Sequence, residues 1–144
     1  CVFRCDNNVV DHQIVNMQME DNVTVSLTMT AFTAVNTRHV KVMGTLGEIV
    51  AEQDKNLVTV TPFGGESTVY DIAAIADDLS GHGGGDNRML TEMFDALDCG
   101  GDVSSSVADS VASHLSALAA EKSRVSGGEL ITIADFEREN CKQK

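Results

Sequence analysis

The sequence predicts an α+β fold in which helices pack on one face of an open, largely antiparallel β-sheet. Its first half alternates apolar and polar residues with a period of two, which is typical of strands. Its second half carries apolar residues at helical spacing. The connections between successive strand patterns are short, and short connections favour antiparallel pairing. Strands followed by helices therefore indicate the α+β class.

The composition indicates one globular domain spanning residues 1–144. The chain has 144 residues, of which 42% are hydrophobic and 22% charged, and its formal net charge is −12. No stretch approaches the roughly 20 apolar residues that cross a bilayer. The acidic balance repels phosphate backbones and anionic lipid surfaces, so we expect neither nucleic acid nor membrane as a partner.

The first residues and the cysteine spacing predict where the chain lies within a protein and in which redox compartment it occurs. Residues 1–5 resemble a strand, so we expect the chain to begin inside a domain or at a boundary within a longer protein. The four cysteines lack C-x-x-C or zinc-type spacing. In an extended segment, Cys1 and Cys5 would lie about 13 Å apart, beyond the reach of a disulfide. Scattered thiols predict a reducing cytoplasm.

A β-hairpin is the clearest strand pattern. Apolar residues alternate with polar ones from Val15 to Glu20 and again from Val23 to Ala31, and Glu20–Asn22 supplies the turn. The second strand places hydroxyl side chains on its other face, at Thr24, Ser26, Thr28 and Thr30. This face carries few formal charges, so we favour a subunit contact there over a merely hydrated surface.

Four further strands are expected after the hairpin. Gly, Asp and Asn clusters separate them, and Pro62 closes the third of the four. Their predicted ranges are 38–43, 48–53, 57–61 and 67–72.

Helix signals fill the second half. An apolar stripe at i, i+3, i+4 and i+7 starts at Leu90, and Gly100-Gly101 ends that helix. Ser106 and Asp109 form a capping-box pattern ahead of a longer helix that Gly127-Gly128 ends. Residues 129–133 are expected to be extended, and Thr132 with Asp135 can cap a terminal helical turn.

The glycine-rich segment Gly81–Asp86 has two interpretations. Glycine is kept where a positive φ or close backbone approach is needed. The segment also opens a helix, whose unpaired N–H groups suit anions or hydroxyl-rich ligands. It is therefore either a ligand-binding loop or a surface turn with Asp86 as the helix N-cap.

Four motifs together resemble the C-terminal domain of the glucose-fructose oxidoreductase / inositol dehydrogenase (Gfo/Idh/MocA) family. They are Val-Asp-His-Gln (Val10–Gln13), Val-Met-Gly-Thr-Leu-Gly-Glu-Ile (Val42–Ile49), Gly-His-Gly-Gly-Gly-Asp (Gly81–Asp86) and Ala-Ala-Glu-Lys-Ser-Arg (Ala119–Arg124). The resemblance covers nearly the whole chain. It implies an open antiparallel sheet whose uncovered face serves oligomerisation. It also implies an N-terminal Rossmann domain that binds NAD or NADP, with the substrate between the two domains.

The family's catalytic motifs are not recognisable here. This chain has no Glu-Lys-Pro and no Gly-x-Gly-x-x-Gly fingerprint after a strand, and the position where the third glycine would fall is Asp86. We expect the Rossmann domain and the catalytic residues to lie upstream of Cys1, so that no cofactor binds this chain alone. The chain would then supply substrate contacts.

The resemblance implies a substrate-binding role for the glycine-rich segment. It places His82 near a bound sugar, with the backbone N–H groups of Gly83 and Gly84 and the carboxylate of Asp86 beside it. His12 is a further substrate-contact candidate, although a structural role is favoured because it and Asp11 should point to opposite faces of a strand. His39 is expected on the surface, and His114 is expected to be partly buried and hydrogen-bonded.

Metal binding is not expected, since His82 and Asp86 alone are too few ligands. Asp77-Asp78 could bind hydroxyls or calcium, but they lack the alternating ligands of an EF-hand loop.

These inferences predict the substrate-binding and oligomerisation domain of a cytoplasmic NAD(P)-dependent oxidoreductase that acts on a sugar or polyol. One alternative is the same domain of an NAD-dependent glycosidase. The other is a non-catalytic assembly domain that pairs subunits through the Thr/Ser face of the sheet.

Overall fold

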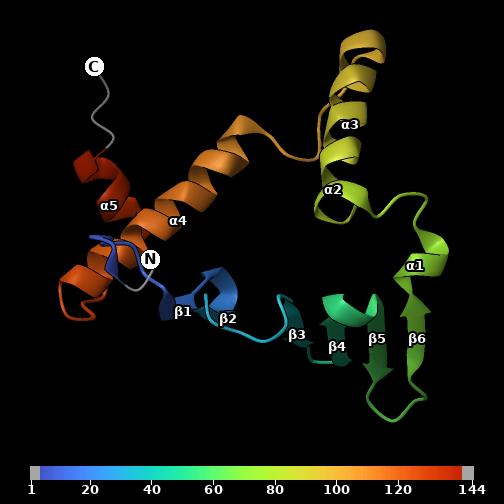
Figure 1. Ribbon diagram of the computed structural model, residues 1–144, viewed down its shortest axis with the longest axis horizontal. Helices are drawn as coiled ribbons and strands as arrows, with labels where there is room; N and C mark the ends of the chain where they lie inside the picture. The colour runs from blue at the N-terminus through green and yellow to red at the C-terminus, as the bar shows by residue number, and fades with distance from the viewer. Residues whose placement is uncertain (1–3, 141–144) are drawn as a thin grey trace. The chain divides into compact units, whose positions relative to one another are not determined.

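The computed structural model describes residues 4–140 and divides the chain into two compact units, Cys1–Ile75 and Ala76–Lys144. The six described strands lie in the first unit and the longer helices in the second (Figure 1). The α+β class and the antiparallel pairing are confirmed. The packing of helices on one sheet face, and the single domain, remain predictions.

The predicted hairpin is present. Strands β1 (His12–Gln18) and β2 (Thr24–Thr30) pair antiparallel, joined by the 3-10 turn η2 (Glu20–Asn22). Their register pairs Val15 with Leu27, so one face is apolar. The hydroxyl-bearing side chains of β2 lie on the other face and are exposed, as the alternation predicts.

The remaining strands form a separate four-stranded sheet. Its order is β3 (His39–Met43), β4 (Gly47–Glu52), β5 (Leu57–Pro62) and β6 (Thr68–Asp71). The expected sheet is thus divided in two at the connection between β2 and β3, which are not hydrogen-bonded to each other. The 3-10 turn η3 (Gln53–Lys55) joins β4 to β5, and the helical turn α1 (Ile72–Ile75) follows β6.

Cross-strand register gives the four-stranded sheet two different faces. One face is apolar, because the register brings together Val40, Val42, Ile49, Ala51, Val58, Val60 and Tyr70. The opposite face carries charged side chains, and Lys41 Nζ lies 2.8 Å from Glu48 Oε2 on it. This two-sided pattern is typical of antiparallel sheets with one hydrated face.

Gly47, the first residue of β4, is a glycine for a steric reason. A Cβ at Gly47 would lie 2.4 Å from the carbonyl oxygen of Thr61 and 2.8 Å from Pro62 Cα. Only a residue without a Cβ lets β4 and β5 approach this closely at the end of their pairing that lies away from the turn η3.

The helices begin and end at the predicted signals. The glycine-rich segment overlaps α2 (Ser80–Gly83), in which Gly81 and His82 have non-helical backbone angles, and the start of α3 (Gly85–Cys99), which Gly100 (φ 72°) ends. α4 (Val107–Val125) begins with the reciprocal Ser106–Asp109 capping box. α5 (Ile133–Asn140) is capped by Thr132 Oγ1, which accepts a 3.3 Å bond from the N–H of Asp135.

Residues 129–132 follow the end of α4 and lie in no described strand or helix, so only Ile133 of the expected extended piece at 129–133 is contradicted. Gly127 N–H donates to the Arg124 carbonyl at 3.2 Å and Gly128 N–H to the Ser123 carbonyl at 2.8 Å, which is a Schellman motif. Ser123 Oγ then donates to the carbonyl of Glu129 at 2.7 Å. The segment is therefore held against the helix end, and Ile133 already begins α5.

At the N-terminus, Arg4 and Cys5 lie outside the strands. The rest of the strand expected at 1–5, with Cys1 and Cys141, lies outside the described residues. Of residues 4–140, only Leu115 and Ala119 are buried, one turn apart on α4, with 8% and 3% of their surface exposed. None of the helices within that range combines the length and apolar character that crossing a bilayer requires.

Candidate functional site

The glycine-rich segment has a run of left-handed residues that extends from α2 to Gly84, the N-cap of α3. Gly81, His82, Gly83 and Gly84 all have positive φ, at 46°, 51°, 70° and 86°. The N–H of Gly84 closes the segment by donating to the Ser80 carbonyl at 2.6 Å. A positive φ is uncommon for a residue with a Cβ, so the conformation of His82 depends on its neighbours.

The left-handed conformation brings His82 onto the first turn of α3. Its Nδ1 lies 2.9 Å from Asp86 Oδ2 and 3.1 Å from Oδ1, and the side chains are 81% and 56% exposed. The structure thus brings together two of the predicted site residues. The surface-turn interpretation is wrong in one respect, because Gly84 is the N-cap of α3 and Asp86 is in its first turn.

This pair defines a hydrogen-bonding surface. The carboxylate of Asp86 is an acceptor, so in the neutral imidazole the Nδ1–H faces it and Nε2 carries the acceptor lone pair. In that form, Nε2 and the carboxylate are free to accept hydrogen bonds from hydroxyl groups. Because both side chains are exposed, their contact contributes little to the stability of the fold.

Asp78 is the residue in this region that sequence reasoning misread. Its Oδ1 accepts from Ser80 N–H at 2.7 Å, and its Oδ2 accepts from Ser80 Oγ at 2.9 Å and from Asn87 Nδ2 at 2.6 Å. The bonds from Ser80, then that from Asn87, hold the pKa of the Asp78 carboxyl below its ordinary value. Its carboxylate serves internal hydrogen bonds, and the Asp-x-Ser spacing of an Asx turn was the available signal.

His12 lies in the first unit, where its Nδ1 is 2.5 Å from Asp11 Oδ1. The expectation that these two side chains point to opposite faces is wrong. Asp11 precedes β1, so the alternation of a strand does not constrain it. The imidazole is 83% exposed, and its substrate contact remains a prediction.

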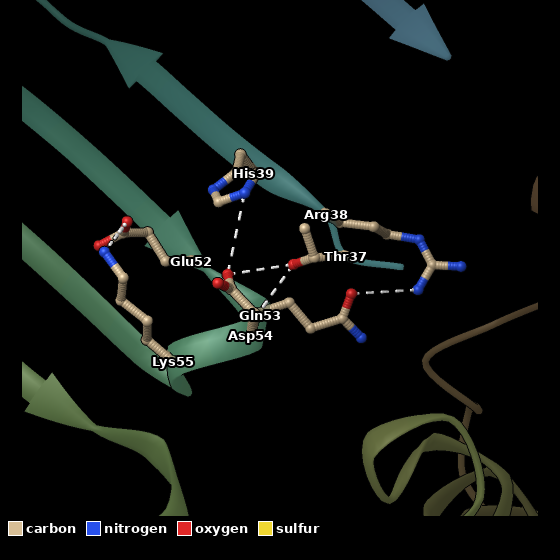
Figure 2. A network of polar contacts seen from close by, with 7 residues as sticks. All are labelled: Thr37, Arg38, His39, Glu52, Gln53, Asp54 and Lys55. Carbon is tan, nitrogen blue, oxygen red and sulfur yellow. Dashed lines mark hydrogen bonds and ion pairs between the residues drawn. The ribbon is translucent and has the colours of Figure 1, made fainter. Parts of the chain in front are cut away.

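His39 takes part in a polar network at the end of the four-stranded sheet (Figure 2). Thr37 Oγ1 donates to Asp54 Oδ1 at 3.1 Å, and His39 Nε2 lies 3.8 Å from the same oxygen. The carboxylate therefore stands between hydroxyl and imidazole, so the imidazole cannot take the hydroxyl proton as in a nucleophilic triad. His39 is exposed, as expected.

His114 donates from its ring to the Ser110 carbonyl, with Nδ1 and O 2.7 Å apart. The expected hydrogen bond is confirmed, but the residue is exposed and not partly buried. The buried residues of α4 are Leu115 and Ala119. Because neighbouring residues on a helix are about 100° apart around its axis, His114 points away from the side of α4 that carries Leu115.

Two hollows among the described residues of the second unit are lined by α4 and α5, and neither is lined by the glycine-rich segment. One, of about 420 Å³, is lined by one side of α4 from Val107 to Leu118. The other, of about 470 Å³, lies where α4 and α5 meet and is lined in part by Glu129, Asp135 and Phe136. Within residues 4–140, no group of three or more His, Cys, Asp or Glu side chains is placed to hold a metal ion.

Comparisons with protein-family models, curated proteins and solved structures find no match for this chain. The resemblance to the Gfo/Idh/MocA family thus stays a prediction from four sequence motifs.

Proposed function

We propose that this chain is the substrate-binding and oligomerisation domain of a cytoplasmic NAD(P)-dependent oxidoreductase that acts on a sugar or polyol. The supporting observation is the solvent-exposed His82–Asp86 pair, with Nδ1 and Oδ2 2.9 Å apart. A sugar offers several neighbouring hydroxyls, and an imidazole beside a carboxylate offers several neighbouring acceptors. The choice of the Gfo/Idh/MocA family rests on the four sequence motifs.

In this proposal the chain holds the substrate and does no redox chemistry itself. His82 Nε2 and the Asp86 carboxylate accept hydrogen bonds from substrate hydroxyls, and the backbone N–H of Gly83 donates to a hydroxyl oxygen. The N–H of Gly84, which the sequence also suggested, is already taken by the Ser80 carbonyl. The hydride would pass to or from a nicotinamide held by a separate Rossmann domain. The proton that accompanies it would be handled by residues of the other domain.

The oligomerisation part of the proposal concerns the hydroxyl-bearing face of β2. Thr24, Ser26, Thr28 and Thr30 are exposed and carry no charge, although the chain has a net charge of −12. A surface without like charges is where two acidic copies meet with the least repulsion.

A second candidate is a domain that only assembles subunits. It is favoured by one observation, that His82 and Asp86 are exposed and line neither of the two hollows described above. Ligand sites are usually concave, so an exposed pair needs a partner surface to enclose a sugar.

A titration of the chain with polyols tests the proposal. Backbone and ring resonances are followed by NMR while myo-inositol, glucose or a hexitol is added. We expect shifts confined to residues near 80–87, and we expect His82→Ala to weaken the best ligand more than tenfold. Arg88→Ala is the matched control, because it breaks another i,i+4 pair on α3, Arg88–Glu92, in which Arg88 is as exposed as His82.

Two results would contradict the proposal. If none of the polyols shifts the 80–87 resonances and the chain still self-associates, the assembly domain is favoured. If the whole protein, with its nucleotide-binding part, cleaves aryl glycosides but does not oxidise free sugars, the glycosidase alternative replaces the oxidoreductase.

A further inference from the structure

We infer that Asp78 is the positioning residue of the His82–Asp86 site: by joining Ser80 to Asn87, its carboxylate holds the glycine-rich segment in the form that brings His82 onto Asp86. That this site binds a ligand rests on the function proposed above. The positioning of His82 by Asp78 rests only on the hydrogen bonds described below.

The carboxylate of Asp78 reaches both ends of the segment. It accepts from the backbone N–H and the hydroxyl of Ser80, at 2.7 and 2.9 Å, immediately before the first glycine. It also accepts from Asn87 Nδ2 at 2.6 Å, immediately after Asp86. One side chain therefore closes the segment into a ring and sets where α3 begins relative to α2.

The backbone of Asp78 also lies close to the glycine-rich segment. A Cβ added to Gly84 would lie 2.3 Å from the Asp78 carbonyl oxygen, and Gly84 has a φ of 86°. A Cβ added to Gly81 would lie 3.0 Å from Asp86 Oδ2. These two glycines are required because the chain passes close to Asp78 on one side and to the Asp86 carboxylate on the other.

Asn87 links the Asp78 carboxylate to the His82–Asp86 site. Asn87 and Asp86 are consecutive in the first turn of α3, so a hydrogen bond that fixes one also fixes the direction of the other. His82 adopts its left-handed φ of 51° only if the bonds around it outweigh the strain. Without Asp78, we expect residues 80–85 to relax and the imidazole to leave Asp86.

The matched control lies on α4. Asp109 accepts from the N–H and the hydroxyl of Ser106, at 3.1 and 2.6 Å, which is the same chemistry at a helix start with no glycine-rich segment. Asp109→Ala should therefore cost helix stability in the same way as Asp78→Ala, without disturbing His82.

The experiment measures ¹⁵N relaxation and the ring ¹⁵N shifts of His82 in the whole chain. In the parent protein we expect rigid amides at 81–85, with order parameters near about 0.85, and the Nδ1–H tautomer wherever the imidazole of His82 is in its neutral form. In Asp78→Ala we expect order parameters below about 0.6 at these amides and loss of the Nδ1–H signature. The Asp109→Ala control should retain both.

Two further variants exclude a general loss of structure. Asn87→Ala removes only the bond to α3 and should loosen 81–85 while α4 stays intact. The double change Asp78→Asn with Asn87→Asp reverses the donor and acceptor, so it should restore the rigidity and the Nδ1–H signature. Unaltered relaxation of 81–85 in both Asp78→Ala and Asn87→Ala, or failure of the double variant to recover, would overturn the inference.

The polyol titration separates this inference from the proposed function. If polyols bind the parent protein, Asp78→Ala should weaken that binding more than tenfold and the double variant should recover it. If polyols do not bind but Asp78→Ala still loosens His82, the positioning role stands and the proposed function fails. If polyols bind equally well to Asp78→Ala and to the parent, the positioning role fails and the proposed function stands.

Discussion

Thr37 and Asp54, which are 17 residues apart, exchange two hydrogen bonds of 3.1 Å (Figure 2). The hydroxyl of Thr37 donates to the carboxylate and accepts from the backbone N–H of Asp54. This exchange ties the start of β3 to the turn η3, beside the 3.1 Å bond from the Gln53 N–H to the Arg38 carbonyl. It is the counterpart, across a sheet, of a helix capping box.

Thr37→Val should destabilise the first unit. The change keeps the shape of the side chain and leaves the N–H of Asp54 without its acceptor, which costs on the order of 1 kcal/mol. Urea unfolding followed by strand circular dichroism measures this cost. Thr33→Val, at an exposed position in the same connection, should change the midpoint by less than half as much. Equal midpoints for the two variants would show that the exchange contributes nothing.

Ala119→Leu should destabilise α4 and its surroundings by about 1–3 kcal/mol, because a side chain with 3% of its surface exposed leaves no space for three more carbons. Ala117→Leu is the control, since Ala117 is exposed on the same helix. Thermal or urea unfolding followed by helical circular dichroism compares them. A cost at Ala117 equal to that at Ala119 would mean that burial is not the cause.

The capping box of α4 should weaken in acid. Bonds from the Ser106 hydroxyl and then from its backbone N–H hold the pKa of Asp109 below the ordinary value of 3.8. The carboxylate therefore stabilises the folded state above about pH 4, and this contribution is lost as pH falls through the lower, folded-state pKa. The stability difference between the parent protein and Asp109→Asn should be largest near neutrality and shrink below about pH 4.

Urea unfolding at pH 7, 4 and 3 measures this difference. Asp102→Asn, in the segment before the helix, serves as the control and should give a smaller difference at pH 7. A parent-minus-Asp109→Asn difference that grows on acidification would contradict the prediction.

Thr28→Glu should separate subunits if the hydroxyl-bearing face of β2 is the contact. Two copies meeting on this face would then bring added carboxylates together, and like charges disfavour the contact. Light scattering over a hundredfold range of concentration should show the parent as an oligomer and the variant as a monomer. Thr33→Glu adds the same charge outside β2 and should leave the assembly intact. A parent protein that is monomeric throughout would exclude this face as a contact.

The sequence by itself determined the local elements. The alternation from Val15 to Ala31 led to the hairpin because a strand turns successive side chains to opposite faces, which depends on the chain alone. The Ser106–Asp109 box and the Gly127–Gly128 ending were likewise predictable, because their partners lie within six residues. The extended piece expected at 129–133 ends earlier than predicted, because Ile133 already begins α5.

The tertiary structure decided which side chains meet. Periodicity does not report the left-handed turn that brings His82 to Asp86, because a spacing of four residues implies contact only in a regular helix. Asp78 and Asn87 are nine residues apart, and Thr37 and Asp54 are separated by two strands, so only the folded backbone sets their distances. Local elements follow from neighbours along the chain, whereas contacts between polar side chains depend on where the chain returns in space.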